Sequence, residues 1–259
     1  MTITIPSSRP CQEPYVAAVV VPTILRPSLR RAVLSVFAQD IDGHGQLLLG
    51  VDKHVGDSGI IGDIMSAKPP NWAVTVLDVG YSTSIRHGGI HAAKDGGSLR
   101  TILSYMANSR HLAYLDDDNW WAPNHLSSLL KAVIGLDYSY TYRMFVEPTN
   151  CTPLAVDSWE SLGPDRGIFL QKFGGFIDPN TLMIDKTRCE PVLRWWAIPL
   201  HGDPKGMSAD RHVFHCLRTQ YRGKRTGMAT CYYVMDPDDG LHSDRMARLR
   251  EAQAGRSAC

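Results

Sequence analysis

Three successive aspartates at 116–118 end an apolar run within the segment 111–121, HLAYLDDDNWW. Adjacent carboxylates are costly in a strand interior or a core. Their mutual repulsion is relieved when water solvates them, or when a hard cation binds their oxygens at the C-terminal end of a strand. Two interpretations are therefore open. One is a metal and phosphate site, and the other is an acidic turn in which Asp118 or Asn119 caps a helix that begins near Pro123.

Apolar runs and helical patterns alternate along the first half of the chain. The expected strands are 15–21, 47–51, 73–79 and 111–115, and the expected helices are 28–38 and 89–107. This alternation predicts an α/β fold with a Rossmann-like, mostly parallel central sheet and helices on both faces. Ligands bind such sheets beyond the carboxyl ends of the strands. The chain places Thr23, Asp52 and the three aspartates at such ends.

The second half is less regular and predicts a smaller antiparallel or irregular part. Residues 138–146 alternate aromatic and polar side chains, which is typical of an edge or antiparallel strand. A helix at 209–220 and a strand at 228–235 are expected to follow, and 242–259 is expected to be a partly ordered helix. The long excursion 53–71 between two strands is interpreted as a lid or as an inserted segment. No linker is long enough to separate two domains.

Composition excludes some classes of function. The formal net charge is +1 and no long basic patch is present, which argues against nucleic acid as the main ligand. The six cysteines show neither a CxxC pair nor a zinc-ligand spacing, which favours reduced thiols in a cytoplasmic protein. The first apolar run, 16–21, is too short to span a bilayer or to form a signal-peptide core. Peripheral attachment to a membrane stays open.

Four segments, in this order, resemble the family 2 glycosyltransferases, which have the GT-A nucleotide-diphospho-sugar fold. They are VVVPTILRPSLRRAVLSVFAQ from Val19, GVD at Gly50 to Asp52, GGIHAAKDGG from Gly88, and YLDDDN from Tyr114. The order and spacing are more specific than any one segment. The resemblance implies a single GT-A domain over 1–259, with a nucleotide-sugar-binding half at about 15–120, an acceptor-side half at about 121–241 and a C-terminal tail at 242–259.

The resemblance also implies which residues hold the donor. Pro22 and Thr23 would line the pocket for the base and ribose, and Asp52 matches a carboxylate that contacts the base. Lys94 stands where the family usually has Arg, so it can neutralise a phosphate but lacks the bidentate fork. The alternatives without a binding role are that Asp52 is a solvated turn residue and that Lys94 is a solvated lysine on a helix.

In this family the acidic motif binds a divalent cation. Asp118 matches the cation ligand, Asp116 matches the carboxylate that contacts the ribose or a coordinated water, and Asp117 lies between them among the substrate-binding residues. Mg²⁺ or Mn²⁺ would neutralise the charge that develops on a departing nucleoside diphosphate. His242, with Arg245 beyond it, matches a residue near the metal or diphosphate, and the alternative is the surface of a frayed tail.

Two further matches concern the acceptor. Asp210 corresponds to the carboxylate that accepts the proton of the acceptor hydroxyl, with Asp203 in reserve. The family's preceding Glu is absent, and a first-turn Asp that stabilises a helix dipole is the alternative. Trp196, in the tandem with Trp195, could form a wall on which a sugar ring stacks, or could belong to the core.

The predicted function is a metal-dependent glycosyltransferase of the hexosyltransferase type. It would move a sugar with inversion from a nucleotide-diphosphate donor to a hydroxyl of a saccharide, lipid-linked glycan or small molecule. A nucleotidyltransferase of the same fold is disfavoured, since the loop PTILRPSLRR after the first strand has no glycine. A catalytically silent sugar-nucleotide-binding module stays open, while a metal phosphohydrolase would require further Lys and Thr motifs. A homo-oligomer is compatible with the sequence.

Overall fold

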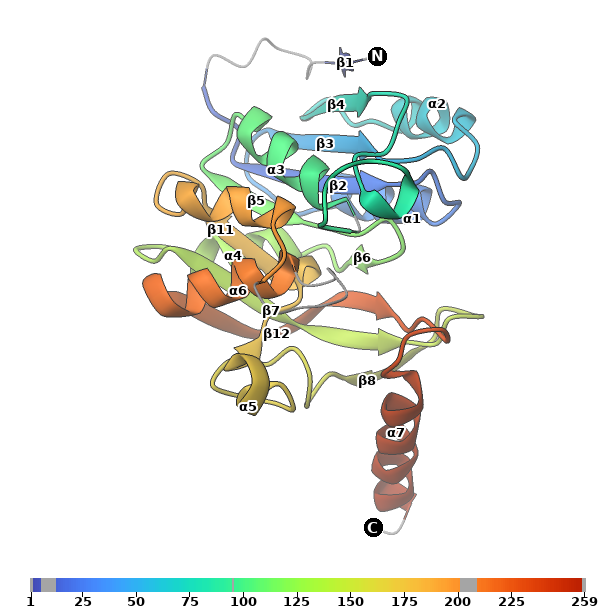
Figure 1. The fold of residues 1–259 in the computed structure, drawn as a ribbon, viewed down its shortest axis with the longest axis vertical. Coiled ribbons are helices and arrows are strands. Elements are labelled where there is room, and N and C mark those ends of the chain that lie inside the picture. Colours follow the sequence, from blue (N-terminus) through green and yellow to red (C-terminus); the bar gives the residue numbers. More distant parts are fainter. Residues whose placement is uncertain (1, 6–12, 95, 201–208, 258–259) are drawn as a thin grey trace.

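The computed structural model describes residues 2–5, 13–94, 96–200 and 209–257. Ten strands of these residues form one mixed sheet that runs through the molecule (Figure 1). In the order of the sheet they are β1 (Thr2–Ile5), β4 (Trp72–Asp78), β3 (Gly45–Val51), β2 (Ala17–Thr23), β5 (His111–Tyr114), β11 (Leu182–Asp185), β7 (Tyr138–Val146), β12 (Gly223–Val234) and β6 (Trp120–Trp121), with β8 (Pro153–Val156) beside β7.

The four strands β4, β3, β2 and β5 are parallel, as the sequence predicts. Every residue of β2 and of β3 is buried, which explains their continuous apolar runs. Strand β11 then pairs antiparallel with β5 and joins this parallel unit to the second half of the sheet. Because the four strands are parallel, their carboxyl ends lie along one edge, where the side chains that follow them can meet.

Alternate residues of β2 enter two different cores, one on each face of the sheet. Val19 and Val21 pack in one core, whereas Ala18 and Val20 pack in the other. The first core is covered by α1 (Leu29–Phe37), α2 (Gly59–Ser66) and α4 (His125–Ala132), and the second by α3 (Gly97–Met106), the 3₁₀ helix η3 (Glu190–Ala197) and α6 (Ala209–Gln220). Helices therefore cover both faces, as expected.

The excursion 53–71 is a crossover between β3 and β4 that contains α2. Ile64 of α2 is fully buried in the same core as α1. The backbone N–H of Gly56 donates to the carbonyl of Ile24 at 3.1 Å, so the start of the excursion is fixed to the loop after β2. This segment thus serves as the packed crossover helix of a βαβ unit.

The helix expected at 89–107 begins only at Gly97, so the first part of that prediction is wrong. Gly88 and Gly96 have φ angles of +89° and +72°, which are left-handed values that end a regular helix. The short 3₁₀ helix η1 (Ile85–His87) and a loop precede α3. Lys94 consequently lies in this loop rather than on a helix.

The second half also departs from expectation. Strand β7 is antiparallel to β11 and β8, as one of the two alternatives expected for it. It is not at an edge, because it lies between β11 and β12, and β12 is parallel to it. Strand β12 begins at Gly223 rather than Met228, with register shifts between Arg225 and Cys231. The remaining elements of this half are β9 (Gly163–Pro164), which pairs with β10 (Gly175–Phe176), the short helix α5 (Leu170–Phe173) and the 3₁₀ helix η2 (Pro179–Thr181).

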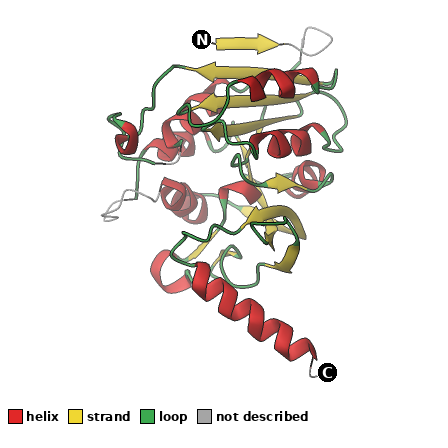
Figure 2. Ribbon diagram, turned by 90° about the vertical axis from the view of Figure 1, so that its right-hand side faces the viewer, coloured by secondary structure: helices red, strands yellow, loops and turns green. Residues whose placement is uncertain are grey.

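The tail forms one helix, α7 (His242–Ser257), which extends away from the body at the end opposite the N-terminal strand (Figure 2). Its first turns are anchored, since Leu249 packs with Phe145 and Met235 in a third small core. None of the helices in the described ranges combines the length and the apolar character that crossing a bilayer requires.

Candidate active site

The ends of β2, β3 and β5 meet at the aspartate triplet. The Thr23 hydroxyl donates to Oδ2 of Asp117 at 2.8 Å, and the N–H of Ile24 donates to the same oxygen at 3.1 Å. The N–H of Asp52 donates to the carbonyl of Thr23 at 2.9 Å. Hydrogen bonds thus join the three strand ends that carry polar residues in the sequence.

Asp117 is the buried member of the triplet, with 5% of its surface exposed. Burial raises the pKa of its carboxyl, while the hydrogen bonds from Thr23 and Ile24 and the charge of Arg26 act in the opposite direction. Its oxygens fix the loop after β2 against the bend after β5.

Asp116 is held by two residues that the sequence analysis did not single out. Its carboxylate forms an ion pair with Arg100 of α3 and accepts a hydrogen bond from the side-chain amide of Asn180 at 2.7 Å. The side-chain Oδ1 of Asn180 accepts in turn from the backbone N–H of Asp116 at 2.6 Å. No local sequence pattern indicates that Asn180 contacts Asp116, because Asn180 lies 64 residues further along the chain.

Asp118 points toward Arg26, whose guanidinium lies 2.8 Å from its Oδ2. Its side chain keeps 41% of its surface exposed. Partial desolvation, with the negative charges of Asp116 and Asp117, raises the pKa of Asp118 to about 7, and Arg26 opposes this rise. A bound cation would favour the ionised form of the same carboxyl.

These residues fit a cation that is shared with a substrate, rather than a cation enclosed by protein. Within the described ranges, no group of three or more His, Cys, Asp and Glu side chains converges on one point. The three aspartates diverge, and the one that points outward is Asp118. Mg²⁺ sites commonly use one or two carboxylates, with substrate phosphates and water as the other ligands. That donor set matches this arrangement.

His242 is the first residue of α7, and its Nδ1 is buried without a hydrogen-bond partner in the described structure. Arg245, one turn later, is committed elsewhere. Its guanidinium donates to Glu160 at 2.7 and 2.9 Å and to Asp239 at 2.8 Å. The Arg245 side chain therefore anchors α7 and is not available to clamp a phosphate.

Asp210 lies in the first turn of α6, and its Oδ1 accepts from the N–H of Arg211 at 2.7 Å. Burial raises the pKa of this carboxyl, and the negative charge of Asp178 adds to the rise, whereas Arg211 and Arg100 lower it. Arg100 is also the partner of Asp116, so the first turn of α6 faces the same group of charges as the triplet. A carboxylate with a raised pKa is suited to accept a proton near neutral pH. Asp203 lies outside the described residues.

The other predicted ligands surround the same edge. Asp52 is buried and accepts a hydrogen bond from the Ser82 hydroxyl at 3.0 Å. Pro22 lies under the loop that carries Lys94, since a Cβ on Gly96 would come within 2.5 Å of the Pro22 side chain. This packing places the Lys94 loop over the end of β2.

Trp196 is only 1% exposed, so neither face of its ring is open to a sugar in this structure. Its ring packs on Tyr114 with 4.6 Å between centroids, and the guanidinium of Arg100 lies 5.5 Å from its centroid. Trp196 therefore supports the arginine that holds Asp116. The neighbouring Trp195 is less buried and stacks on His212 at 3.9 Å.

A buried ion network lies behind the triplet and was also missed by sequence reasoning. Arg143 of β7 donates to Asp157, Glu160 and Asp178 at 2.7 to 3.0 Å. Asp178 accepts from Asn180 at 2.7 Å, so the network continues to Asp116. The C-terminal half thus holds one end of the site in place.

Comparison with solved structures identifies proteins that share this fold. Neither a protein-family model nor a curated protein sequence matches the chain at a significant level. Among solved structures, S. aureus TarS 1-349 in complex with UDP-GlcNAc matches with a TM-score of 0.58 and 12% identity, over 88% of this chain and 61% of that chain. The mannosyltransferase PcManGT from Pyrobaculum calidifontis, in complex with GDP-Man and Mn²⁺, matches with a TM-score of 0.58 and 13% identity, over 97% and 66%. The chain spans less than two thirds of these relatives and shares with them the GT-A fold that its sequence predicts.

Proposed function

We propose that this chain is a metal-dependent glycosyltransferase that moves a hexosyl group from a nucleoside diphosphate to an acceptor hydroxyl with inversion. The observation that carries the proposal is the meeting of Thr23, Asp52 and Asp117 at one sheet edge, with Asp118 next to Asp117 and partly exposed. The same fold holds UDP-GlcNAc in TarS and GDP-Man with Mn²⁺ in PcManGT, which supports a nucleotide sugar as the ligand.

The donor would lie across the ends of β2, β3 and β5. Pro22, Thr23 and Asp52 would line the nucleoside site, and Asp116 would contact the ribose or a coordinated water. Asp117 would keep the loop after β2 in the shape that receives the nucleoside. Lys94 would face the phosphates from its loop as a point charge.

Asp118 would hold the divalent cation together with the two donor phosphates. We assign His242, whose Nδ1 has no hydrogen-bond partner in the described structure, as a second ligand. Mn²⁺ or Mg²⁺ bound there would neutralise the negative charge that accumulates on the departing diphosphate. Arg100 and Asn180 would keep the Asp116 carboxylate in a fixed orientation during this step.

Asp210 would act as the general base. As the acceptor oxygen forms its bond to the anomeric carbon, the bond from that carbon to the phosphate oxygen breaks and its electron pair leaves with the diphosphate. The hydroxyl proton passes to the Asp210 carboxylate, whose raised pKa favours its acceptance. Attack from the face opposite the leaving group inverts the anomeric carbon.

Two variants test the assignment, and neither requires knowledge of the acceptor. Binding of a donor to the folded protein raises its melting temperature, so a panel of nucleotide sugars with and without Mn²⁺ identifies the donor. Slow hydrolysis of that donor then reports the chemistry. We expect Asp118→Asn to lose the Mn²⁺-dependent thermal shift. Asp210→Asn should keep the shift while donor hydrolysis falls by about 10²- to 10⁴-fold.

The matched control is Asp63→Asn, since Asp63 is exposed on α2 and its loss also removes one negative charge. It should behave as the wild type in both measurements. Wild-type rates for both Asp118→Asn and Asp210→Asn at saturating Mn²⁺ would contradict the proposal. Tight donor binding without any turnover would instead favour a sugar-nucleotide-binding module.

A further inference from the structure

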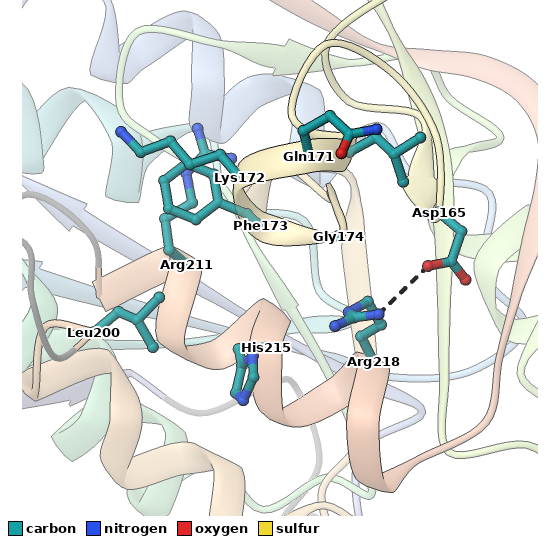
Figure 3. Close-up of a pocket in the computed structure, with 10 residues that line it drawn as sticks. Asp165, Gln171, Lys172, Phe173, Gly174, Leu200, Arg211, His215 and Arg218 are labelled. Carbon is teal, nitrogen blue, oxygen red and sulfur yellow. Dashed lines mark hydrogen bonds and ion pairs between the residues drawn. The ribbon is translucent and has the colours of Figure 1, made fainter.

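A cavity of about 560 Å³ lies between α5 and α6, outside the donor site described above (Figure 3). Arg211, His215 and Arg218 line it from one face of α6 at helical spacing, and Lys172 lines it from α5. Among the described residues around it, three permanent cations stand against the single carboxylate of Asp165. The cavity is therefore electropositive, and its volume is in the range of small-molecule sites.

Arg211 lies near the carboxylates of Asp210 and Asp178 and packs against aromatic rings. The guanidinium of Arg211 lies 3.5 Å from the ring centroid of Phe176 and 4.2 Å from that of Phe169. Its Nη1 is buried without a hydrogen-bond partner in the described structure. Burial lowers the pKa of Arg211, which an anion close to the guanidinium would offset.

Among the described residues, Arg218 has one ionic partner, Asp165, at 3.3 Å (Figure 3). That carboxylate is 73% exposed, so water and salt screen the pair. The Nε of Arg218 is buried and also has no hydrogen-bond partner in the described structure. Both arginines line the cavity, and each has one nitrogen without a hydrogen-bond partner in the described structure.

The cavity adjoins the proposed base along the chain. Arg211 directly follows Asp210 in the first turn of α6, and its backbone N–H donates to the Asp210 carboxylate. A molecule held at this face of α6 would be anchored one residue from the group that is to accept its proton. Asp210 also lies within electrostatic reach of Asp178 and of Arg100, which pairs with Asp116 in the donor site.

We propose that this cavity binds a phosphate group carried by the acceptor, so that a phosphorylated sugar or polyol is the preferred acceptor class. The assignment rests on the proposed transferase function. The guanidinium groups of Arg211 and Arg218 and the ammonium group of Lys172 supply charge-assisted hydrogen bonds to the phosphate oxygens. The phenylalanine rings hold Arg211 in place, as stacked guanidinium groups are held at other phosphate sites.

The test is calorimetric titration of the full chain, without donor and with a chelator, using glucose 6-phosphate, glucose and inorganic phosphate as probes. We expect saturable binding of glucose 6-phosphate, weaker binding of phosphate and no measurable binding of glucose. The double variant Lys172→Gln, Arg218→Gln should weaken the binding of glucose 6-phosphate by about tenfold or more.

Lys131→Gln is the matched control, since Lys131 is exposed in the last turn of α4 and its loss also removes one positive charge. Lys172→Gln alone keeps the test valid if the double variant does not fold, because the Lys172 side chain is exposed. Its dissociation constant for glucose 6-phosphate should rise by a few fold.

Two results would overturn the proposal. One is equal binding of glucose 6-phosphate by the wild type and the Lys172 variants, and the other is equal affinity for inorganic phosphate and glucose 6-phosphate. Nucleotide-sugar binding with Mn²⁺ is measured separately on the same samples. A protein that binds the sugar phosphate but no nucleotide sugar would therefore refute the transferase function and leave the anion site standing.

Discussion

The two halves of this sheet are held together by different physics. The parallel unit β4, β3, β2 and β5 is buried on both faces, and its cohesion comes from apolar area. The half around β7 and β12 instead surrounds Arg143, which is 2% exposed and meets three carboxylates. Buried charges are strongly unfavourable unless every partner is present. One half should therefore tolerate gradual change, and the other should fail when a single group is removed.

The largest effect is expected from Arg143→Met. This change leaves Asp157, Glu160 and Asp178 without their common cation, so we expect the free energy of unfolding to fall by about 3–5 kcal/mol. Urea unfolding followed by circular dichroism measures it. A loss below about 1 kcal/mol would show that the network does not stabilise this half.

Acidification should destabilise the same network. Burial alone would raise the pKa of Asp157, but Arg143 and three backbone N–H groups lower it below its ordinary value. A lowered pKa in the folded state gives stability that is present above the unfolded pKa, near 4, and is lost as pH falls below it. We expect wild-type stability to fall between roughly pH 5 and pH 3, and this part of the fall should be smaller in Arg143→Met, where only the backbone N–H groups still lower the pKa.

Leu48→Ala is the counterpart in the parallel unit. Leu48 is fully buried in the core under α3, so its truncation should cost about 2–5 kcal/mol through lost contacts and a cavity. No charge is involved, and the loss should be the same at pH 7 and pH 5. Unfolding curves at the two pH values check this, and a loss that depends on pH would remove the distinction between the halves.

Asn180→Ala tests the connection between the halves. The side chain donates to both Asp116 and Asp178 and accepts from the backbone of Asp116. Loss of these buried hydrogen bonds is on the order of 1–3 kcal/mol, so donor affinity should fall by about tenfold or more. Calorimetric titration of the donor with Mn²⁺ measures it. Asn124→Ala is the control, since Asn124 makes no side-chain capping bond at α4, and its donor affinity should be unchanged.

The smallest effect concerns Arg26, whose pair with Asp118 is exposed where the pairs of Arg143 are buried. In the absence of donor, Arg26 occupies the oxygen proposed to bind the cation. Exposed pairs are weak, so Arg26→Gln should tighten Mn²⁺ binding by no more than about fivefold. The electron paramagnetic resonance signal of free Mn²⁺ measures this. Arg30→Gln, an exposed charge loss on α1, should have little effect, and weaker Mn²⁺ binding by Arg26→Gln would contradict the competition.

The parallel half was predictable because its signals are local. Continuous apolar runs give β2 and β3, and the polar residues directly after them, Thr23 and Asp52, lie at the shared edge. The start of α3 was missed because the left-handed Gly96 separates the Lys94 loop from the helix. That loop reads as a continuous helical pattern in sequence.

The other half could not be predicted in the same way, because its contacts join distant residues. The partners of Arg143 lie 14 to 35 residues away in irregular segments, and nothing near β7 indicates that it would be interior. The sequence did not identify Arg100 and Asn180 as site residues for the same reason, although both contact Asp116. The cavity beside α6 depends on how α5 folds back, which no periodicity encodes.

The ion pair between Glu160 and Arg245 bears on how the molecule is made. All four parallel strands lie within residues 17–114. They are therefore synthesised early in translation and can pair with one another before the rest of the chain is made. Arg143 and Glu160 emerge from the ribosome long before Arg245, and until α7 arrives Glu160 has one cation instead of two. We expect nascent chains released before residue 245 to keep an ordered nucleotide half and a loosened acceptor half, and so to be preferred clients of chaperones and proteases.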